Sequence, residues 1–595
     1  MPIAASITKL SHKKAHEAEN ASSRFLCLFA AGNCQSAVTL VLAVSLAVVV
    51  PAMFWGIPSN LDLTNHFRFA LPFYDAIAAG NLYPGWLAES NGGYGDPSFR
   101  FYPPALYYLF AAARFVIGNW YAAILLVFVI VSIAGGLGMY FWSKSILPPA
   151  SAIWASVFYA LAPYHLNQLY QATLLAEWAG SAVLPFVFGF VERVCERGKR
   201  RDIAGLAATY GLLIFTHLPL AVIGSMVLLV YVLVRVDGPD RIRKLAKLAV
   251  GAALGLSLSA VYWVTMVAEV GWIGINQIQR DASVDYRVNF LFSTFSPENL
   301  NVWWMNILAL MTVLLFMPGL WLLFNRGVTT EGHTDKKAVR GVIALTGFAL
   351  FMAVPLSRPI WNLFRPLQET QFPWRWLILV SMGGSILAAA GIGRLFGVRR
   401  LGATLLSITP DRGQSGAKAP HSKGAPKLAV LGAMTISIVF TLSHVVREAQ
   451  YLPPQKFENM LTSVRGTPSV NYWFPIWARA DVRKMSTEVE AGDRAVTVTS
   501  WQTEQRRFSV TAGPGTEARV RTFYYPHWIA KTETGVLATR PDSDGALLIS
   551  LPQHATSVEL DFQEPRRNKF STISSLSGLI IIGSLAVPFR RRQKR

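Results

Sequence analysis

Charge is scarce in this sequence, because Asp, Glu, Lys and Arg together make up only 15% of its 595 residues. Soluble globular chains carry about 25%, so the shortage excludes an ordinary soluble fold. It leaves long apolar runs, such as residues 36–55, 120–142 and 218–234. A helix needs about 20 apolar residues to cross a bilayer, where its backbone groups must find partners within the segment. The runs therefore predict membrane-spanning helices.

Cysteine is also rare, since the chain has only Cys27, Cys34 and Cys195. None follows residue 195, so no disulfide can hold the C-terminal half of the chain together. The only Asn-x-Ser/Thr sequence starts at Asn20, in the N-terminal tail. The lack of external glycosylation sequences favours a bacterial plasma (inner) membrane.

Basic residues are plentiful but unevenly placed. The formal net charge is +21, which in a soluble protein would suggest nucleic-acid binding. Lys and Arg gather in alternate segments between the apolar runs, as at 193–201, 235–247, 394–427 and 590–595. The positive-inside rule then puts both termini in the cytoplasm. The basic charge thus reflects topology, and the expected partner is the lipid bilayer rather than nucleic acid.

The whole pattern predicts a mainly α, polytopic membrane protein with about twelve spanning helices and a β-rich C-terminal part. Between residues 495 and 562, β-branched and aromatic residues alternate between Gly, Pro and Asp turns, which is typical of short antiparallel strands in a small extracytoplasmic sandwich. The expected parts are a cytoplasmic tail (1–34), a transmembrane domain (35–446) with a long first external loop (56–118) and a disordered cytoplasmic linker (408–427), the β-rich domain (447–571), and a last spanning helix with a basic tail (572–595).

The first external loop is dense in aromatic, Gly and Pro residues. Asp62 follows the first apolar run, and the loop then reads YPGW at 83–86 and GYGDPSFRFYPP at 93–104. These motifs resemble those of bacterial membrane proteins named for a 6-pyruvoyl-tetrahydropterin synthase-related domain, which are similar in turn to GT-C glycosyltransferases. Further segments carry the resemblance, namely Tyr164–Glu177, Thr216–Pro219, Gln371–Arg375 and Phe523–Trp528.

The resemblance implies a GT-C-like transmembrane domain that moves a sugar from a polyprenyl-phosphate carrier to an extracytoplasmic glycan, lipid or protein. It also implies that Asp62 takes the place of the catalytic acid, and Glu177 that of a second acid, which binds metal or acceptor in some relatives. An acceptor hydroxyl loses a proton as it attacks, and a carboxylate is a suitable base. The alternatives are structural: Asp62 could cap a helix, and Glu177 could favour a helix N-terminus.

Two histidines are candidate substrate-binding residues. If residues 62–66 are helical, His66 shares a face with Asp62 at i,i+4, where it would orient that carboxylate or bind the acceptor. His217 lies in a tight turn between two apolar runs. The alternative for both is a structural hydrogen bond, which at His217 would satisfy the exposed backbone of the turn.

Three arginines are candidates for the donor phosphate: Arg358, Arg365 and Arg375. A guanidinium binds phosphate oxygens bidentately and would stabilise the charge of the leaving phosphate. Arg375 is preferred, because Pro373 fixes a helix start beside it. The alternative is interfacial anchoring by snorkelling within an aromatic belt.

Paired carboxylates are missing, since neither of the first two external loops contains an Asp-x-Asp sequence. Divalent cations normally recruit several oxygen donors, so the isolated acids Asp62 and Glu177 would be a poor site for Mg²⁺ or Mn²⁺. This argues against a metal-dependent mechanism and leaves open a metal-independent one with Asp62 as base.

Two other functions compete with glycosyl transfer. A transporter or flippase of a lipid-linked or polar substrate would place ionisable residues near the middle of its helices and often contain broken inverted repeats. Here the polar residues collect on one side, which favours surface chemistry. A non-catalytic envelope-assembly protein on the same scaffold, with the β-rich domain binding a partner, differs only in lacking activity.

Overall fold

The computed structural model describes residues 34–274, 284–294, 300–324, 335–396, 425–465, 467, 473–479 and 481–587. The predicted N-terminal tail, most of the predicted linker and the last basic residues lie outside this part. The described helices are α2 (Cys34–Trp55), α3 (Leu63–Ala78), α4 (Ala105–Ile117), α5 (Trp120–Ser143), α6 (Pro149–Ala160), α7 (Pro163–Tyr170), α8 (Leu175–Glu196), α9 (Arg200–Thr216), α10 (Leu218–Arg235), α11 (Arg241–Leu258), α12 (Ala260–Glu269), α14 (Leu300–Leu315), α15 (Met317–Phe324), α16 (Lys336–Ala353), α17 (Arg358–Leu363), α18 (Arg365–Gln368), α19 (Leu377–Phe396), α21 (Ala425–Phe440), α22 (Pro454–Val464) and α23 (Arg566–Ala586).

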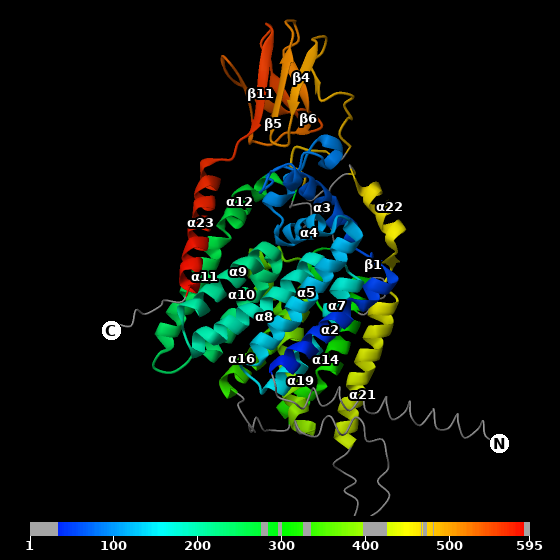
Figure 1. Cartoon of the computed structure of the whole chain (residues 1–595), viewed down its shortest axis with the longest axis vertical. Coiled ribbons are helices and arrows are strands. Elements are labelled where there is room, and N and C mark those ends of the chain that lie inside the picture. Colours follow the sequence, from blue (N-terminus) through cyan, green and yellow to red (C-terminus); the bar gives the residue numbers. More distant parts are fainter. Residues whose placement is uncertain are drawn as a thin grey trace, which may run out of the picture.

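Within the described ranges, seven helical segments are long and apolar enough to cross a membrane. The number is up to nine if each of two bent pairs is one span, namely α11 with α12, bent by 69°, and α16 with α17, bent by 88°. The mainly helical membrane architecture is therefore present, whereas the count of about twelve stays a prediction. Figure 1 shows these helices below the β-strands, with α3 and α4 between the two layers.

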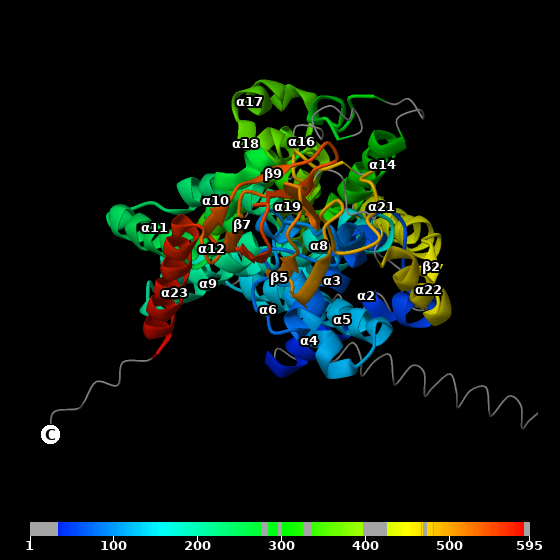
Figure 2. The same ribbon diagram turned by 90° about the horizontal axis from the view of Figure 1, so that it is seen from above.

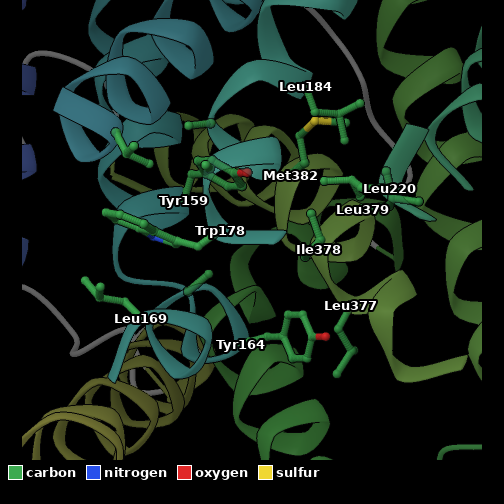
Figure 3. Close-up of a cluster of buried hydrophobic side chains, with 14 of the residues drawn as sticks. Tyr159, Tyr164, Leu169, Trp178, Leu184, Leu220, Leu377, Ile378, Leu379 and Met382 are labelled. Carbon is green, nitrogen blue, oxygen red and sulfur yellow. The ribbon is translucent and has the colours of Figure 1, made fainter. Parts of the chain in front are cut away.

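The helical layer packs around α8 and α19. Figure 3 shows part of this core, where Trp178 and Leu184 of α8 lie near Tyr159 of α6 and Met382 of α19. Small residues allow close approach of the helices. The backbone at Gly391 of α19 faces Pro318 so closely that a Cβ there would lie 2.0 Å from the carbonyl oxygen of Pro318.

The C-terminal strands form two antiparallel sheets. The strands are β3 (Val489–Glu490), β4 (Val496–Trp501), β5 (Gln505–Val510), β6 (Glu517–Phe523), β7 (Trp528–Thr532), β8 (Gly535–Leu537), β9 (Thr539–Pro541), β10 (Ala546–Ser550) and β11 (Thr556–Phe562). Their order is β3-β6-β10-β9 in one sheet and β4-β5-β11-β7-β8 in the other. Both sheets contribute to one hydrophobic core, which also takes in Trp86 and Tyr94 of the first loop. Figure 2 shows the strands from above, over the helical layer.

A second link joins the end of α2 to the segment after α21. The short strands β1 (Ile57–Pro58) and β2 (Tyr451–Leu452) pair antiparallel. The helix α22, which follows β2, contacts α3. The first loop is thus held by the segment that follows α21, the last long span before the β-sheets.

A buried group of ionic side chains joins the helices to the β-sheets. The guanidinium of Arg100 donates to Glu269 at the end of α12, with its Nε 2.6 Å from Oε2 and its Nη2 2.8 Å from Oε1. Glu269 is fully buried and also accepts from the Tyr525 hydroxyl at 2.8 Å, lies 2.9 Å from Nε2 of His527, and accepts from Nη2 of Arg567 at 2.7 Å. We call these residues, together with Glu564, the junction cluster.

The junction cluster joins four chain segments and pairs its charges across them. Arg100 also donates to both oxygens of Glu564, which precedes α23. Burial alone would lower the pKa of Arg100, but the hydrogen bonds to Glu269 and Glu564 raise it. The cation is therefore held permanently charged between two carboxylates, one from a helix end and one from beyond the last strand.

Replacing Glu269 with Gln should lower thermal stability strongly. The substitution keeps the side-chain size but leaves Arg100 with Glu564 as its remaining carboxylate partner, and breaking a buried ion pair typically costs about 3–5 kcal/mol. Thermal unfolding in detergent would show this as a lower midpoint. Glu533→Gln, at an exposed turn between β7 and β8, is the matched control. Equal midpoints for the two variants would contradict a stabilising junction cluster.

Candidate functional site

The N-terminus of α3 is capped by a residue from another loop. Asp62 occupies the N-cap position, yet its side chain makes no capping hydrogen bond. Instead, the Oγ1 of Thr173 accepts from the backbone N–H groups of Asp62, at 2.9 Å, and Leu63, at 3.1 Å. Free N–H groups at a helix start need such a partner. Because Thr173 supplies it, the carboxylate of Asp62 is not used as a cap.

The N-terminus of α8 is capped in return by α3. The backbone N–H of Leu175, the first residue of α8, donates to Nε2 of His66 at 3.1 Å. Thr173 is fully buried and has a φ of +48°, a conformation that a β-branched residue rarely adopts. This reciprocal capping places the loop that carries Asp62 against the helix that carries Glu177.

The contacts of His66 fix the position of its ring proton. Since Leu175 donates to Nε2, the neutral ring carries its hydrogen on Nδ1, which lies 2.9 Å from the hydroxyl oxygen of Tyr107 and donates to it. Burial lowers the pKa of His66, and the nearby Asp62 only partly opposes this. His66 thus remains neutral and joins the two helices.

The carboxylate of Asp62 is partly accessible. Its side chain is 26% exposed, and its Oδ2 lies 3.4 Å from Nε2 of His66. The Oδ1 accepts from Nδ2 of Asn65 at 2.9 Å, and the Oδ1 of Asn65 accepts in turn from Arg68 at 2.8 Å. Asp62 is therefore oriented by neighbours on its own helix while keeping room for an incoming group.

Glu177 lies in a different environment, because both of its oxygens are already engaged. Its side chain is 1% exposed. The Oε1 accepts from the hydroxyl of Tyr164 at 3.0 Å and from Nε2 of Gln168 at 2.8 Å. The Oε2 accepts from Nε of Arg375 at 2.8 Å. Glu177 and Arg375, 198 residues apart, thus form a buried ion pair.

Arg375 is held in place by more than Glu177. It lies in a short 3₁₀ helix, Pro373–Trp376, just before α19, and one of its terminal nitrogens donates to the carbonyl of Thr370. Its guanidinium carbon stands 4.9 Å from the centre of the Phe372 ring. The preceding Gln371 has a φ of +66°. A strained turn and a carboxylate therefore fix this cation next to the start of α8.

Tyr102 lies within the electrostatic reach of both acids. Burial and then Asp62 raise the pKa of its hydroxyl, while a hydrogen bond from Tyr107 and the charge of Arg375 oppose them. The hydroxyl oxygen of Tyr107 in turn accepts the hydrogen bond from Nδ1 of His66. Tyr102 lies inside the first-loop motif, but the motif alone does not indicate that this hydroxyl lies near the two acids.

The other predicted site residues have different partners. Nδ1 of His217 accepts from the backbone N–H of Leu220 at 3.2 Å and so caps α10. This is the structural role considered for His217 as the alternative, and its role in substrate binding stays a prediction. Arg358 donates to the carbonyl of Arg287, and Arg365 lies 3.5 Å from Glu369. Within the described part of the chain, neither exposed arginine bonds to Asp62 or Glu177.

The residues present do not fit a divalent cation. Glu177 spends both oxygens on hydrogen bonds and faces the positive charge of Arg375. Asp62 alone offers too few donors, since such ions usually take six or more oxygens. Among the residues that the structure places, no three His, Cys, Asp or Glu side chains group closely enough to hold a metal.

Comparison with known proteins gives one family. The model of a membrane-protein family, described as the 6-pyruvoyl-tetrahydropterin synthase related domain, matches residues 99–410. No curated protein matches the chain.

Several solved structures are similar to the chain at low identity. The arabinofuranosyltransferase AftD from Mycobacteria is 16% identical over 69% of this chain, with a TM-score of 0.43, and the chain covers only 27% of its length. ArnT from Cupriavidus metallidurans, bound to undecaprenyl phosphate, is 14% identical over 74% of this chain and 78% of its own, with a TM-score of 0.41. The oligosaccharyltransferase AglB from Archaeoglobus fulgidus, in complex with an inhibitory peptide and a dolichol-phosphate, is 12% identical over 74% of this chain and 61% of its own, with a TM-score of 0.38.

Replacing Thr173 with Val tests whether the Thr173 hydroxyl caps α3. Valine has the same shape but leaves the N–H groups of Asp62 and Leu63 without their acceptor, at a cost of about 1–3 kcal/mol. The unfolding midpoint should fall accordingly. Thr462→Val, which removes an exposed hydroxyl that bonds within α22, should leave the midpoint unchanged. A Thr173→Val protein as stable as this control would disprove the cap.

The neutral state of His66 predicts a loss of stability in acid. Because burial lowers its folded-state pKa below the unperturbed 6.5, its contribution is complete above pH 6.5 and is lost as the pH falls towards the folded-state value. Unfolding midpoints between pH 8 and 5 should therefore fall less steeply for His66→Gln than for the unaltered protein. His444→Gln, at an exposed position, should follow the unaltered protein. A parallel curve for His66→Gln would show that His66 is not the titrating group.

Proposed function

Since the chain belongs to the membrane-protein family of the 6-pyruvoyl-tetrahydropterin synthase related domain, we propose that it is an integral membrane glycosyltransferase. It moves a sugar from a polyprenyl-phosphate-linked donor to an extracytoplasmic glycan, lipid or protein. One observation carries the proposal: reciprocal capping sets a partly exposed carboxylate, Asp62, beside a buried arginine–carboxylate pair, Arg375 and Glu177.

Asp62 acts as the general base in this proposal. Its carboxylate is accessible and is not needed to cap α3. As the acceptor oxygen bonds to the anomeric carbon, the hydroxyl proton passes to Asp62, and the bond between that carbon and the phosphate oxygen breaks. The lipid phosphate leaves with both electrons of that bond.

Arg375 stabilises the leaving phosphate, and Glu177 positions Arg375. A fixed cation stabilises developing negative charge more than a mobile one, because it need not reorganise during the reaction. Both oxygens of Glu177 already accept hydrogen bonds from the protein, and its side chain is 1% exposed. We therefore assign Glu177 to the placement of Arg375 rather than to proton transfer.

The topology completes the proposal. We place the site and the β-sheets, as a small sandwich, on the extracytoplasmic side of the plasma (inner) membrane, with both termini in the cytoplasm and about twelve spans. The first loop supports this arrangement, since it contributes to both the site and the core of the β-sheets. The sugar would then be transferred where the lipid phosphate meets water.

Replacing Asp62 with Asn should lower sugar transfer by about 10²–10⁴-fold. Transfer from native lipid-linked donors would be measured in membranes that contain equal amounts of each protein. Asp75→Asn is the control, because Asp75 lies on the same helix but pairs with Arg465 at the surface. Transfer by Asp62→Asn at the rate of the control would refute the assigned base, and no transfer by any form would favour an assembly or transport role.

A further inference from the structure

A groove opens between α23 and the break in α11–α12, away from the site of Asp62 and Arg375. Both views show α23 running beside α11 and α12 at the edge of the molecule (Figures 1 and 2). The groove has a volume of about 420 Å³, within the range of roughly 300–1,000 Å³ usual for ligand pockets. Its wall is mainly apolar and includes Leu256, Ala260, Trp263, Val264 and Phe570, with Arg567 at one end.

The break in the helix creates this space. After Ser259 the axis turns by 69°, which frees backbone groups and moves α12 away from the line of α11. The hydroxyl of Ser575 accepts the freed N–H of Val261 at 2.9 Å, and Ser257 donates to the carbonyl of Ser574 at 2.9 Å. These polar contacts fasten α23 to the break and leave the apolar side chains beside it as an open wall.

Basic residues gather at the end of α23 that faces the β-sheets. Arg566, Arg567 and Lys569 fall within its first four residues. Arg567 donates to Glu269 through one nitrogen. In the part of the chain that the structure describes, Arg566 and Lys569 are exposed and form no ion pair. Positive charge at the start of a spanning helix, above an apolar groove, matches an anionic head group above an apolar tail.

We propose that this groove binds an anionic phospholipid from the leaflet on the side of the β-sheets. One acyl chain lies against Trp263, Val264 and Phe570, and the phosphate lies among Arg566, Arg567 and Lys569. An apolar wall within spanning helices is filled by hydrocarbon rather than water, because an empty space forfeits contacts on one side. Basic residues at the membrane surface attract anionic lipids. The proposal does not depend on glycosyl transfer.

The bound lipid would also stabilise the junction cluster. Arg567 reaches both the groove and Glu269, so a phosphate beside it fixes the side chain that helps to neutralise Glu269. Only 22% of the spanning window of α23 is buried in the protein, so most of this helix is open to lipid. Lipid binding should therefore appear as thermal stabilisation of the whole chain.

The test measures unfolding of the full chain in detergent with added phosphatidylglycerol, phosphatidylcholine or inorganic phosphate. Phosphatidylglycerol should raise the midpoint by about 2–4 °C more than phosphatidylcholine, and inorganic phosphate should have no effect. Equal stabilisation by the two lipids would overturn the charge-based proposal. Stabilisation by inorganic phosphate as large as that by phosphatidylglycerol would overturn the role of the groove.

Two variants locate the effect. Val264→Trp fills the groove and should abolish the phosphatidylglycerol shift, whereas Val267→Trp, on the exposed side of the same helix, should retain it. The double variant Arg566→Gln with Lys569→Gln leaves Arg567 bonded to Glu269 and should remove the preference for phosphatidylglycerol. This surface variant tests the head-group contact even if Val264→Trp does not fold. A full shift in either Val264→Trp or the double variant would refute the proposal.

Discussion

The candidate site depends on two helix N-termini whose free backbone N–H groups are capped reciprocally. Thr173 accepts the first N–H groups of α3, and His66 accepts the first N–H of α8. Unsatisfied backbone groups in a buried place cost about 1–3 kcal/mol each, so separating the two helix ends would expose three donors at once. This requirement explains why a strained, fully buried threonine is kept between them. It also sets the relative position of Asp62 and Glu177 without using either carboxylate.

The two acids differ because of their surroundings. Asp62 stands at the edge of the group, is 26% exposed and receives one hydrogen bond from Asn65. Glu177 is buried and ion-paired with Arg375. Nε of Arg375 lies 2.8 Å from Oε2 of Glu177, so each of these buried charges has an opposite charge as its partner. In the proposed function, proton transfer and charge stabilisation therefore fall to different residues, and two similar acids in the sequence do not reveal this difference.

The sequence predicted much of the fold but only part of the site. The apolar runs predicted the helices α2, α5 and α10, because a helix that crosses lipid must be about 20 residues long and mostly apolar. Alternation between residues 495 and 562 predicted short strands, and β4 to β11 lie in this range. The pairing of Arg375 with Glu177 and the capping role of Thr173 could not be predicted, since they join positions 198 and 111 residues apart. A threonine that caps a distant helix leaves no periodic signal, and neither does the tautomer of His66, which depends on Leu175.

The first-loop motif therefore cannot be interpreted as catalytic throughout. Tyr102 lies near Asp62 and Arg375, but Arg100, two residues earlier, belongs to the junction cluster with Glu269. The motif of the β-sheets contributes to the same cluster, because Tyr525 and His527 bond to Glu269 rather than to the site. Arg100, in the junction cluster, and Tyr102, near the site, are thus two residues apart on one turn. The turn that carries Tyr102 is thus linked to the β-rich region through Arg100 and Glu269, whereas the contacts described for Asp62 and Glu177 include no β-strand residue.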